Sequence, residues 1–264
     1  MVSISIENFL TNFLRTYPMP FSAKELLAML CGLGHKITIN ELREFLDNDI
    51  RVFALQKNMY ITRAGAFTNQ LFSFVPTQRE VEQKVFIPGD RCMPFVDLDI
   101  LSFSLSFEYM GKKLPNKLFS TDCNTARDLF CLYGDEFSAQ YISSDPACKD
   151  LHIAENSFEL PFKLNLTGIS MEPIFEQVDF KYGDRILCRV YDWDKGIIEL
   201  IPLLTHKLNP FQISSEDMER QKWNETLENA LLESFDSMGP CSSIEEQLAN
   251  VFYENKNQLC VPDC

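Results

Sequence analysis

The spacing of apolar and polar positions predicts three helices at the start of the chain. Apolar side chains there recur every three or four residues, the period of a helix with one buried face. The predicted helices cover residues 4–14, 22–32 and 38–49. Ser22 with Glu25, and Thr38 with Glu41, match the capping-box pattern at the beginnings of the second and third helices. Two short strands, 51–55 and 59–62, follow around a polar turn. Three helices followed by a hairpin is the order of a winged helix.

A longer segment carries a resemblance to a known family. Residues 21–67, FSAKELLAMLCGLGHKITINELREFLDNDIRVFALQKNMYITRAGAF, resemble the HARE-type winged helix-turn-helix that also occurs at the N-terminus of the bacterial RNA polymerase delta subunit. The resemblance rests on the helix spacing, on Val52, Phe53 and Tyr60 in the wing, and on Leu42, Leu46 and Asp49 at the end of the third helix. It implies a winged-helix fold and a role near transcription or chromatin, often through protein contacts.

The outer face of the third helix leaves two kinds of partner open. With Ile39, Leu42, Phe45 and Leu46 turned inward, the outward side chains are Asn40, Glu41, Arg43, Glu44, Asp47 and Asn48. Cations bind nucleic-acid phosphates, whereas carboxylates oppose that contact. We therefore expect Glu41, Glu44 and Asp47 to belong to a protein-docking face. The alternative is a weak DNA contact, made by Asn40, Arg43 and Asn48 on the helix and by Lys57 and Arg63 on the wing.

From residue 85 the pattern changes to short β-rich segments broken by turns. Residues 102–108 alternate Phe or Leu with Ser, which predicts a strand with one wet face. Residues 184–203 predict a hairpin that turns at Gly196. One amphipathic helix is expected over residues 124–133. We predict a β-rich, barrel-like α+β domain over residues 85–205, after a winged-helix domain over residues 1–75.

Residues 206–264 predict an acidic helical arm. Ser214 is expected to cap a first helix that ends at Gly239, and Ser242 a second. Trp223, Leu227, Leu231 and Phe235 form an apolar stripe along the first helix. This stripe either docks a partner protein or a second copy of the chain, or covers the core of the same molecule.

Charge and cysteine content narrow the class of protein. The chain has a net charge of −14, which opposes binding to polyphosphate by the overall field. Residues 1–70 do not share this acidic excess, because they carry seven basic and six acidic side chains. Nine cysteines, with no secretion signal ahead of them, indicate reduced thiols in the cytoplasm. No apolar stretch is long enough to predict a membrane span.

Little in the sequence points to catalysis. His35, His152 and His206 are far apart in the chain, and Cys260 with Cys264 would need two further ligands to hold zinc. The sequence contains no glycine-rich phosphate-binding loop, no G-x-S-x-G nucleophile elbow and no H-E-x-x-H zinc-protease motif. No catalytic residue, cofactor or metal ligand is predicted. The sequence favours a transcription-linked regulator or adaptor that works through protein contacts, with a nucleic-acid binder and an enzyme of the middle region as alternatives.

Overall fold

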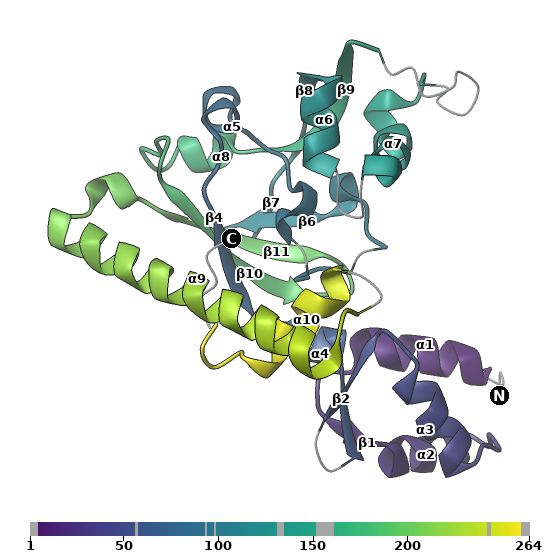
Figure 1. The fold of residues 1–264 in the computed structure, drawn as a ribbon. Coiled ribbons are helices and arrows are strands. Elements are labelled where there is room, and N and C mark those ends of the chain that lie inside the picture. The colour runs from purple at the N-terminus through teal and green to yellow at the C-terminus, as the bar shows by residue number, and fades with distance from the viewer. Residues whose placement is uncertain are drawn as a thin grey trace.

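The structure is a computed structural model that describes residues 5–55, 58–92, 94–97, 99–130, 135–151, 161–241 and 244–259. Helices and strands are mixed along the chain, as Figure 1 shows, so the predicted α+β class is confirmed. No helix among the described residues has the length and apolar character that crossing a bilayer requires.

The first part of the chain forms three helices and a small antiparallel sheet, here called the N-terminal module. Its elements are α1 (Ile6–Thr16), β1 (Phe21–Ser22), α2 (Ala23–Gly32), α3 (Ile39–Asp47), β2 (Val52–Leu55) and β3 (Met59–Thr62). The sheet order is β1-β3-β2. Both predicted capping boxes are present at the starts of α2 and α3. Leu14, Leu26, Leu42 and Leu46 pack with Phe21 in the module's own core.

A five-stranded mixed sheet forms the centre of the molecule. Its strands, in the order β4-β10-β11-β6-β7, are β4 (Leu71–Phe74), β10 (Arg185–Asp192), β11 (Ile197–Leu203), β6 (Ser106–Tyr109) and β7 (Lys112–Lys113). The predicted hairpin of residues 184–203 is confirmed as β10 and β11. The barrel prediction is wrong, because the described edge strands β4 and β7 do not pair and the sheet stays open.

A second, three-stranded sheet lies beside the first. It contains β5 (Val85–Phe86), β9 (Lys163–Ser170) and β8 (Asn116–Asp122), in that order. The helices α6 (Cys123–Phe130) and α7 (Asp135–Ser144) pack together next to it. The strand predicted from residue 102 begins only at Ser106, because Ser102–Ser104 form a 3₁₀ turn in which Ser102 is buried. The two sheets with their connecting segments are here called the body. Its described residues also include three short α-helices: α4 (Arg63–Phe67), α5 (Gln78–Gln83) and α8 (Glu172–Phe175).

Two helices at the end of the chain, here called the arm, cross one face of the central sheet (Figure 1). They are α9 (Pro210–Met238) and α10 (Ile244–Glu254). α9 begins earlier than predicted, because Asn209 and Gln212 form its capping box in place of Ser214. Ser242, the predicted cap of the second helix, lies outside the described residues.

β4 pairs with β10, so the central sheet includes residues from the segment that the sequence assigned to the N-terminal domain. The predicted domain boundaries therefore stay a prediction.

Candidate protein-docking site

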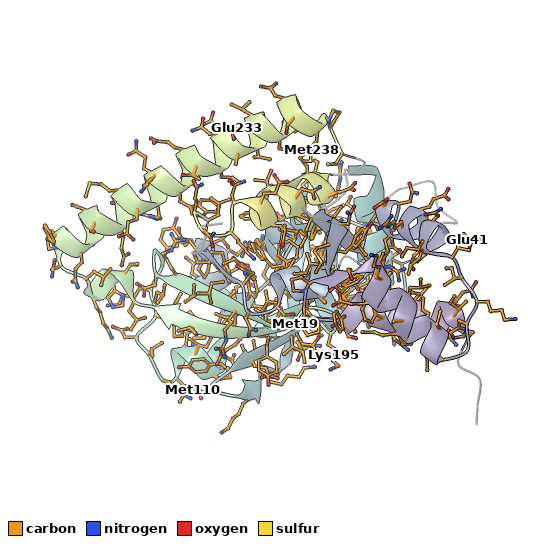
Figure 2. The ribbon with its side chains drawn as sticks, turned by 90° about the horizontal axis from the view of Figure 1, so that it is seen from below. Met19, Glu41, Met110, Lys195, Glu233 and Met238 are labelled. Atoms are coloured by element: carbon orange, nitrogen blue, oxygen red, sulfur yellow. The ribbon has the colours of Figure 1, made fainter. Side chains whose placement is uncertain are left out.

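The outer surface of α3 begins at a capping box formed by Thr38 and Glu41. The Glu41 carboxylate accepts hydrogen bonds from the Thr38 backbone N–H at 2.8 Å and from the Thr38 hydroxyl at 2.7 Å. These two bonds lower the pKa of Glu41, so its carboxylate is negatively charged at neutral pH. Figure 2 shows Glu41 at the outer edge of the N-terminal module.

Phe45 lies on this outer surface, contrary to the prediction that it points into the core. Its side chain is 37% exposed, whereas Leu42 and Leu46 of the same helix are buried. The reason is geometric: Leu42 and Leu46 lie one turn apart and cover the buried face of this short helix, while Phe45 lies beside their stripe. The sequence pattern alone did not separate these positions.

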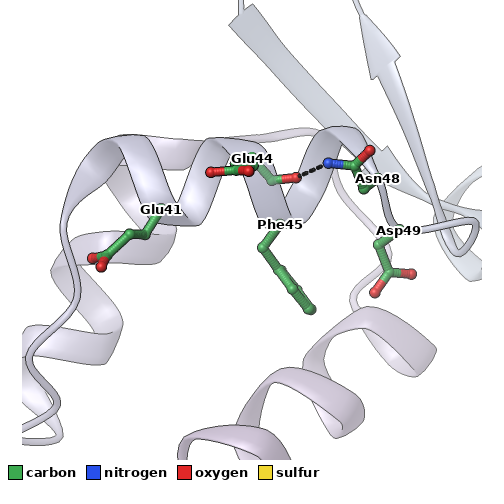
Figure 3. A pocket seen from close by; sticks show the side chains of 5 residues that line it. All are labelled: Glu41, Glu44, Phe45, Asn48 and Asp49. Carbon is green, nitrogen blue, oxygen red and sulfur yellow. Dashed lines mark hydrogen bonds between the residues drawn. The ribbon is translucent and has the colours of Figure 1, made fainter.

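A shallow hollow of about 400 Å³, here called the α3 pocket, surrounds Phe45. Its lining residues are Glu41, Glu44, Phe45, Asn48 and Asp49. Figure 3 shows the phenyl ring between the carboxylates of Glu41 and Asp49, and the Asn48 amide donating a hydrogen bond to the Glu44 carbonyl at 2.6 Å. The α3 pocket therefore combines an apolar centre with three carboxylates and an amide.

Asp47 has a different role from the other two predicted docking carboxylates. It accepts a hydrogen bond of 2.8 Å from the Tyr60 hydroxyl, which ties α3 to β3. Burial, followed by this bond to Asp47, raises the pKa of Tyr60. Glu41 and Glu44 thus lie at the α3 pocket, while Asp47 supports the helix that carries them.

The candidate nucleic-acid contacts are scattered. Asn40 is exposed on α3 and Arg43 is half-buried. Arg63 is only 6% exposed, and its guanidinium carbon lies 5.8 Å from the centre of the Phe53 ring. The prediction that Arg63 reaches phosphates from the wing is therefore wrong, because its charge is held inside the protein. Lys57 lies outside the described residues.

The arm covers one side of the β2–β3 hairpin. Phe53 of β2 stacks on Tyr253 of α10, with ring centres 5.3 Å apart and planes 12° apart. The ammonium of Lys256 lies 5.1 Å from the centre of the Tyr253 ring. Because this stack closes one side of β2, that side cannot approach a DNA backbone without opening the contact.

A second hollow, of about 390 Å³, adjoins the α3 pocket through the shared residues Asn48 and Asp49. We call it the junction pocket. Arg51 donates to Asp49 through Nε at 2.9 Å and Nη2 at 2.6 Å. Burial opposes the charged form of Asp49, but the bonds from Arg51 outweigh it and hold the pKa of Asp49 below its usual range.

The predicted stripe on α9 mostly covers the molecule's own core. Trp223 is 8% exposed, and Leu227 and Leu231 are partly buried against the same core cluster. Phe235 keeps 47% of its surface exposed. The stripe is an apolar face as predicted, and Phe235 is the most exposed of these four side chains.

The described residues offer little for metal or redox chemistry. None of their His, Cys, Asp and Glu side chains form a group of three that could hold a metal ion. Their six cysteines are free thiols. His206 contacts Asp184 through Nδ1 at 2.7 Å, whereas His152, Cys260 and Cys264 lie outside the described residues. No known protein family, curated protein or solved structure matches the chain.

Proposed function

We propose that this protein is a non-enzymatic adaptor that binds a partner protein through the α3 pocket. The observation that carries the proposal is the exposed ring of Phe45 among the carboxylates of Glu41, Glu44 and Asp49. Aromatic residues that can be fully desolvated supply much of the energy of protein interfaces. Carboxylates around them select a partner by charge. The complementary partner segment carries Lys or Arg around one apolar side chain.

The proposal includes a winged-helix identity for the N-terminal module. Its element order, α1-β1-α2-α3-β2-β3, with a sheet in the order β1-β3-β2, supports this identity. The link to transcription rests on the resemblance of residues 21–67 to the HARE-type domain. A winged helix that acts by protein contact does not need a basic recognition helix. The helix in that position here, α3, is not basic.

Three features of the described residues argue against the alternative that the protein binds DNA. Arg63 is buried, Tyr253 covers one side of β2, and three carboxylates line the α3 pocket. Each such carboxylate repels the DNA backbone. These features favour a protein partner over a nucleic acid.

Fluorescence anisotropy with the full-length chain tests the proposal. The probes are labelled short peptides in which Lys and Arg flank one Leu or Phe, matched peptides with Glu for the cations, and a random-sequence DNA duplex. We expect binding to the basic apolar peptides only. Phe45→Ala should weaken it by about tenfold or more, as for an interface hot spot, and Glu44→Lys should also weaken it.

Phe211→Ala is the matched control, because Phe211 is a highly exposed phenylalanine on α9. It should leave peptide binding unchanged. Equal loss in both phenylalanine variants, or duplex binding that exceeds peptide binding, would reject the proposed function.

A further inference from the structure

The C-terminal half of α9 has an apolar flank that the described residues leave partly uncovered. Leu227, Leu231, Phe235 and Met238 recur every three or four positions, so they form one row along the helix. Leu227 and Leu231 are partly buried against the core, whereas Phe235 is 47% and Met238 49% exposed. Figure 2 shows Met238 at the C-terminal end of the helix.

The second helix of the arm, α10, packs against a different face of α9. The side-chain amide of Gln247 donates a hydrogen bond to the Ser234 hydroxyl, and Phe252 stacks on Trp223 with ring centres 6.1 Å apart. Ser234 and Trp223 are both buried. The contacts with α10 therefore bury the face that carries these two residues and leave the neighbouring flank, with Phe235, open.

A shallow hollow of about 350 Å³ lies on this flank. Its lining residues are Asn224, Leu227, Glu228, Leu231 and Leu232. We call this hollow, together with Phe235 and Met238, the α9 groove. It shares no residue with the α3 pocket, so a partner in the α9 groove is independent of the proposed function.

A row of carboxylates runs beside the apolar row. Glu225, Glu228, Leu232 and Asp236 recur every three or four positions, and all four side chains are exposed. Residues 223–255 contain seven acidic side chains and no lysine, arginine or histidine. This part of the chain therefore supplies no cation of its own to the carboxylates of the groove.

The end of α9 adds to the negative charge. The backbone carbonyls at a helix C-terminus carry a partial negative charge, which cations stabilise and carboxylates oppose. The last turn of α9 has no basic residue, and Asp236 lies within it. A cation brought by a partner to this end of the helix would offset both the carbonyls and the carboxylate.

We propose that the α9 groove binds an amphipathic helix of a partner protein whose apolar stripe is flanked by Lys or Arg. The apolar row from Leu227 to Met238 covers about three turns. A helix laid along it seats its own apolar side chains at matching spacing. Lys and Arg beside that stripe meet the carboxylates of Glu225, Glu228 and Asp236. A second copy of the chain is disfavoured, because the same carboxylates would face each other across a two-fold interface.

Fluorescence anisotropy of the full-length protein with three labelled peptides of about 18 residues, long enough to form a helix, tests this proposal. The first peptide carries Leu on one helical face and Lys elsewhere. The second has the same Leu positions with Glu for Lys, and the third has the composition of the first in scrambled order. We expect the first to bind about tenfold or more tightly than the other two. Equal affinity for the first and third peptides, or no binding of the first, would overturn the proposal.

Two phenylalanine variants locate the site. Phe235→Ala should weaken binding of the first peptide by about tenfold or more. Phe45→Ala is the matched control, because Phe45 is a partly exposed phenylalanine of the α3 pocket, and it should leave the affinity within about twofold. A loss in the Phe45 variant alone would place the peptide in the α3 pocket, which contradicts this proposal and leaves the proposed function standing. Peptides shorter than about 12 residues hold a helix poorly in water, so the short probes of the α3 pocket are poor ligands for the α9 groove.

The charge of the groove is tested separately. Glu228→Gln should weaken binding of the first peptide, because it removes a carboxylate that lines the hollow. Glu233→Gln is the control, since Glu233 is exposed on α9 but does not line the hollow. Equal effects of the two changes would contradict the assigned partner. Self-association in sedimentation that Phe235→Ala abolishes would assign the groove to a second copy and also overturn the proposal.

Discussion

The guanidinium of Arg15 on α1 donates to the carboxylate of Asp97 in the body at 2.5 Å. The same guanidinium donates through Nε to Asp194, in the turn between β10 and β11, at 2.6 Å. One arginine of the N-terminal module thus holds two carboxylates of the body. Burial, together with the nearby charges of Asp99 and Asp194, raises the pKa of Asp97, whereas the positive charge of Arg15 opposes this rise and stabilises the charged cluster.

Arg15→Gln should destabilise the protein by about 1–2 kcal/mol at pH 7, because Asp97 and Asp194 would repel without the shared cation. The folded-state pKa of Asp97, which burial already raises, should then rise further, so the folded state binds more protons than the unfolded state as the pH falls. The loss of unfolding free energy caused by Arg15→Gln should therefore be smaller at pH 4 than at pH 7. Urea unfolding at both pH values measures it. Lys195→Gln, at an exposed pair with Asp192, is the control and should show little loss. An equal loss for Arg15→Gln at both pH values would contradict this account.

Two phenylalanines of the arm should differ sharply in their contribution to stability. Phe252 packs in the core beside Phe95 and Trp223, whereas Phe235 is half exposed. Phe252→Ala should cost about 3–5 kcal/mol, since it leaves a cavity. Phe235→Ala should change stability by less than about 0.5 kcal/mol. Urea unfolding of both variants checks the contrast, and similar losses would show that the arm does not pack as described.

Asp184 should make stability depend on pH in the acidic range. Burial opposes its charged form, but the backbone N–H groups of His206 and Lys181 and further bonds from His206 and Thr205 lower the pKa of Asp184 overall. A lowered pKa adds stability above the ordinary aspartate value, and that stability is lost as the pH falls through the lowered value. Asp184→Asn should therefore reduce the melting temperature at pH 7, and this reduction should shrink as the pH falls below the ordinary aspartate value. A reduction that is the same at every pH would be inconsistent with this role.

The stack of Phe53 on Tyr253 should hold the β2–β3 hairpin against the arm. Tyr253→Ala removes an aromatic pair that contributes about 0.5–1.5 kcal/mol beyond its buried area. Backbone amides of β2 and β3 should then exchange faster with deuterium, while those of α2 keep their protection. Tyr191→Ala, at an exposed tyrosine of β10, is the matched control and should leave β2 and β3 unchanged. Unchanged exchange in the Tyr253 variant would show that other contacts hold the β2–β3 hairpin.

Local patterns alone determined much of the secondary structure. Ser22 with Glu25 and Thr38 with Glu41 identified two helix starts, because a capping box involves residues only three positions apart. The β10–β11 hairpin followed from two apolar runs around Gly196, whose φ of 59° suits a tight turn. The apolar stripe of α9 was also visible, since its period is a property of the helix itself.

Tertiary packing decided the features on which the proposals rest. Phe45 is exposed because Leu42 and Leu46 already fill the space behind α3, and Arg63 is buried because Phe53 lies against it. Phe235 and Met238 stay half exposed because α10 packs against the face of α9 that carries Trp223 and Ser234. Periodicity shows which side of an element is apolar. Which side chain meets which neighbour depends on contacts between distant segments, and these arise only when the chain folds.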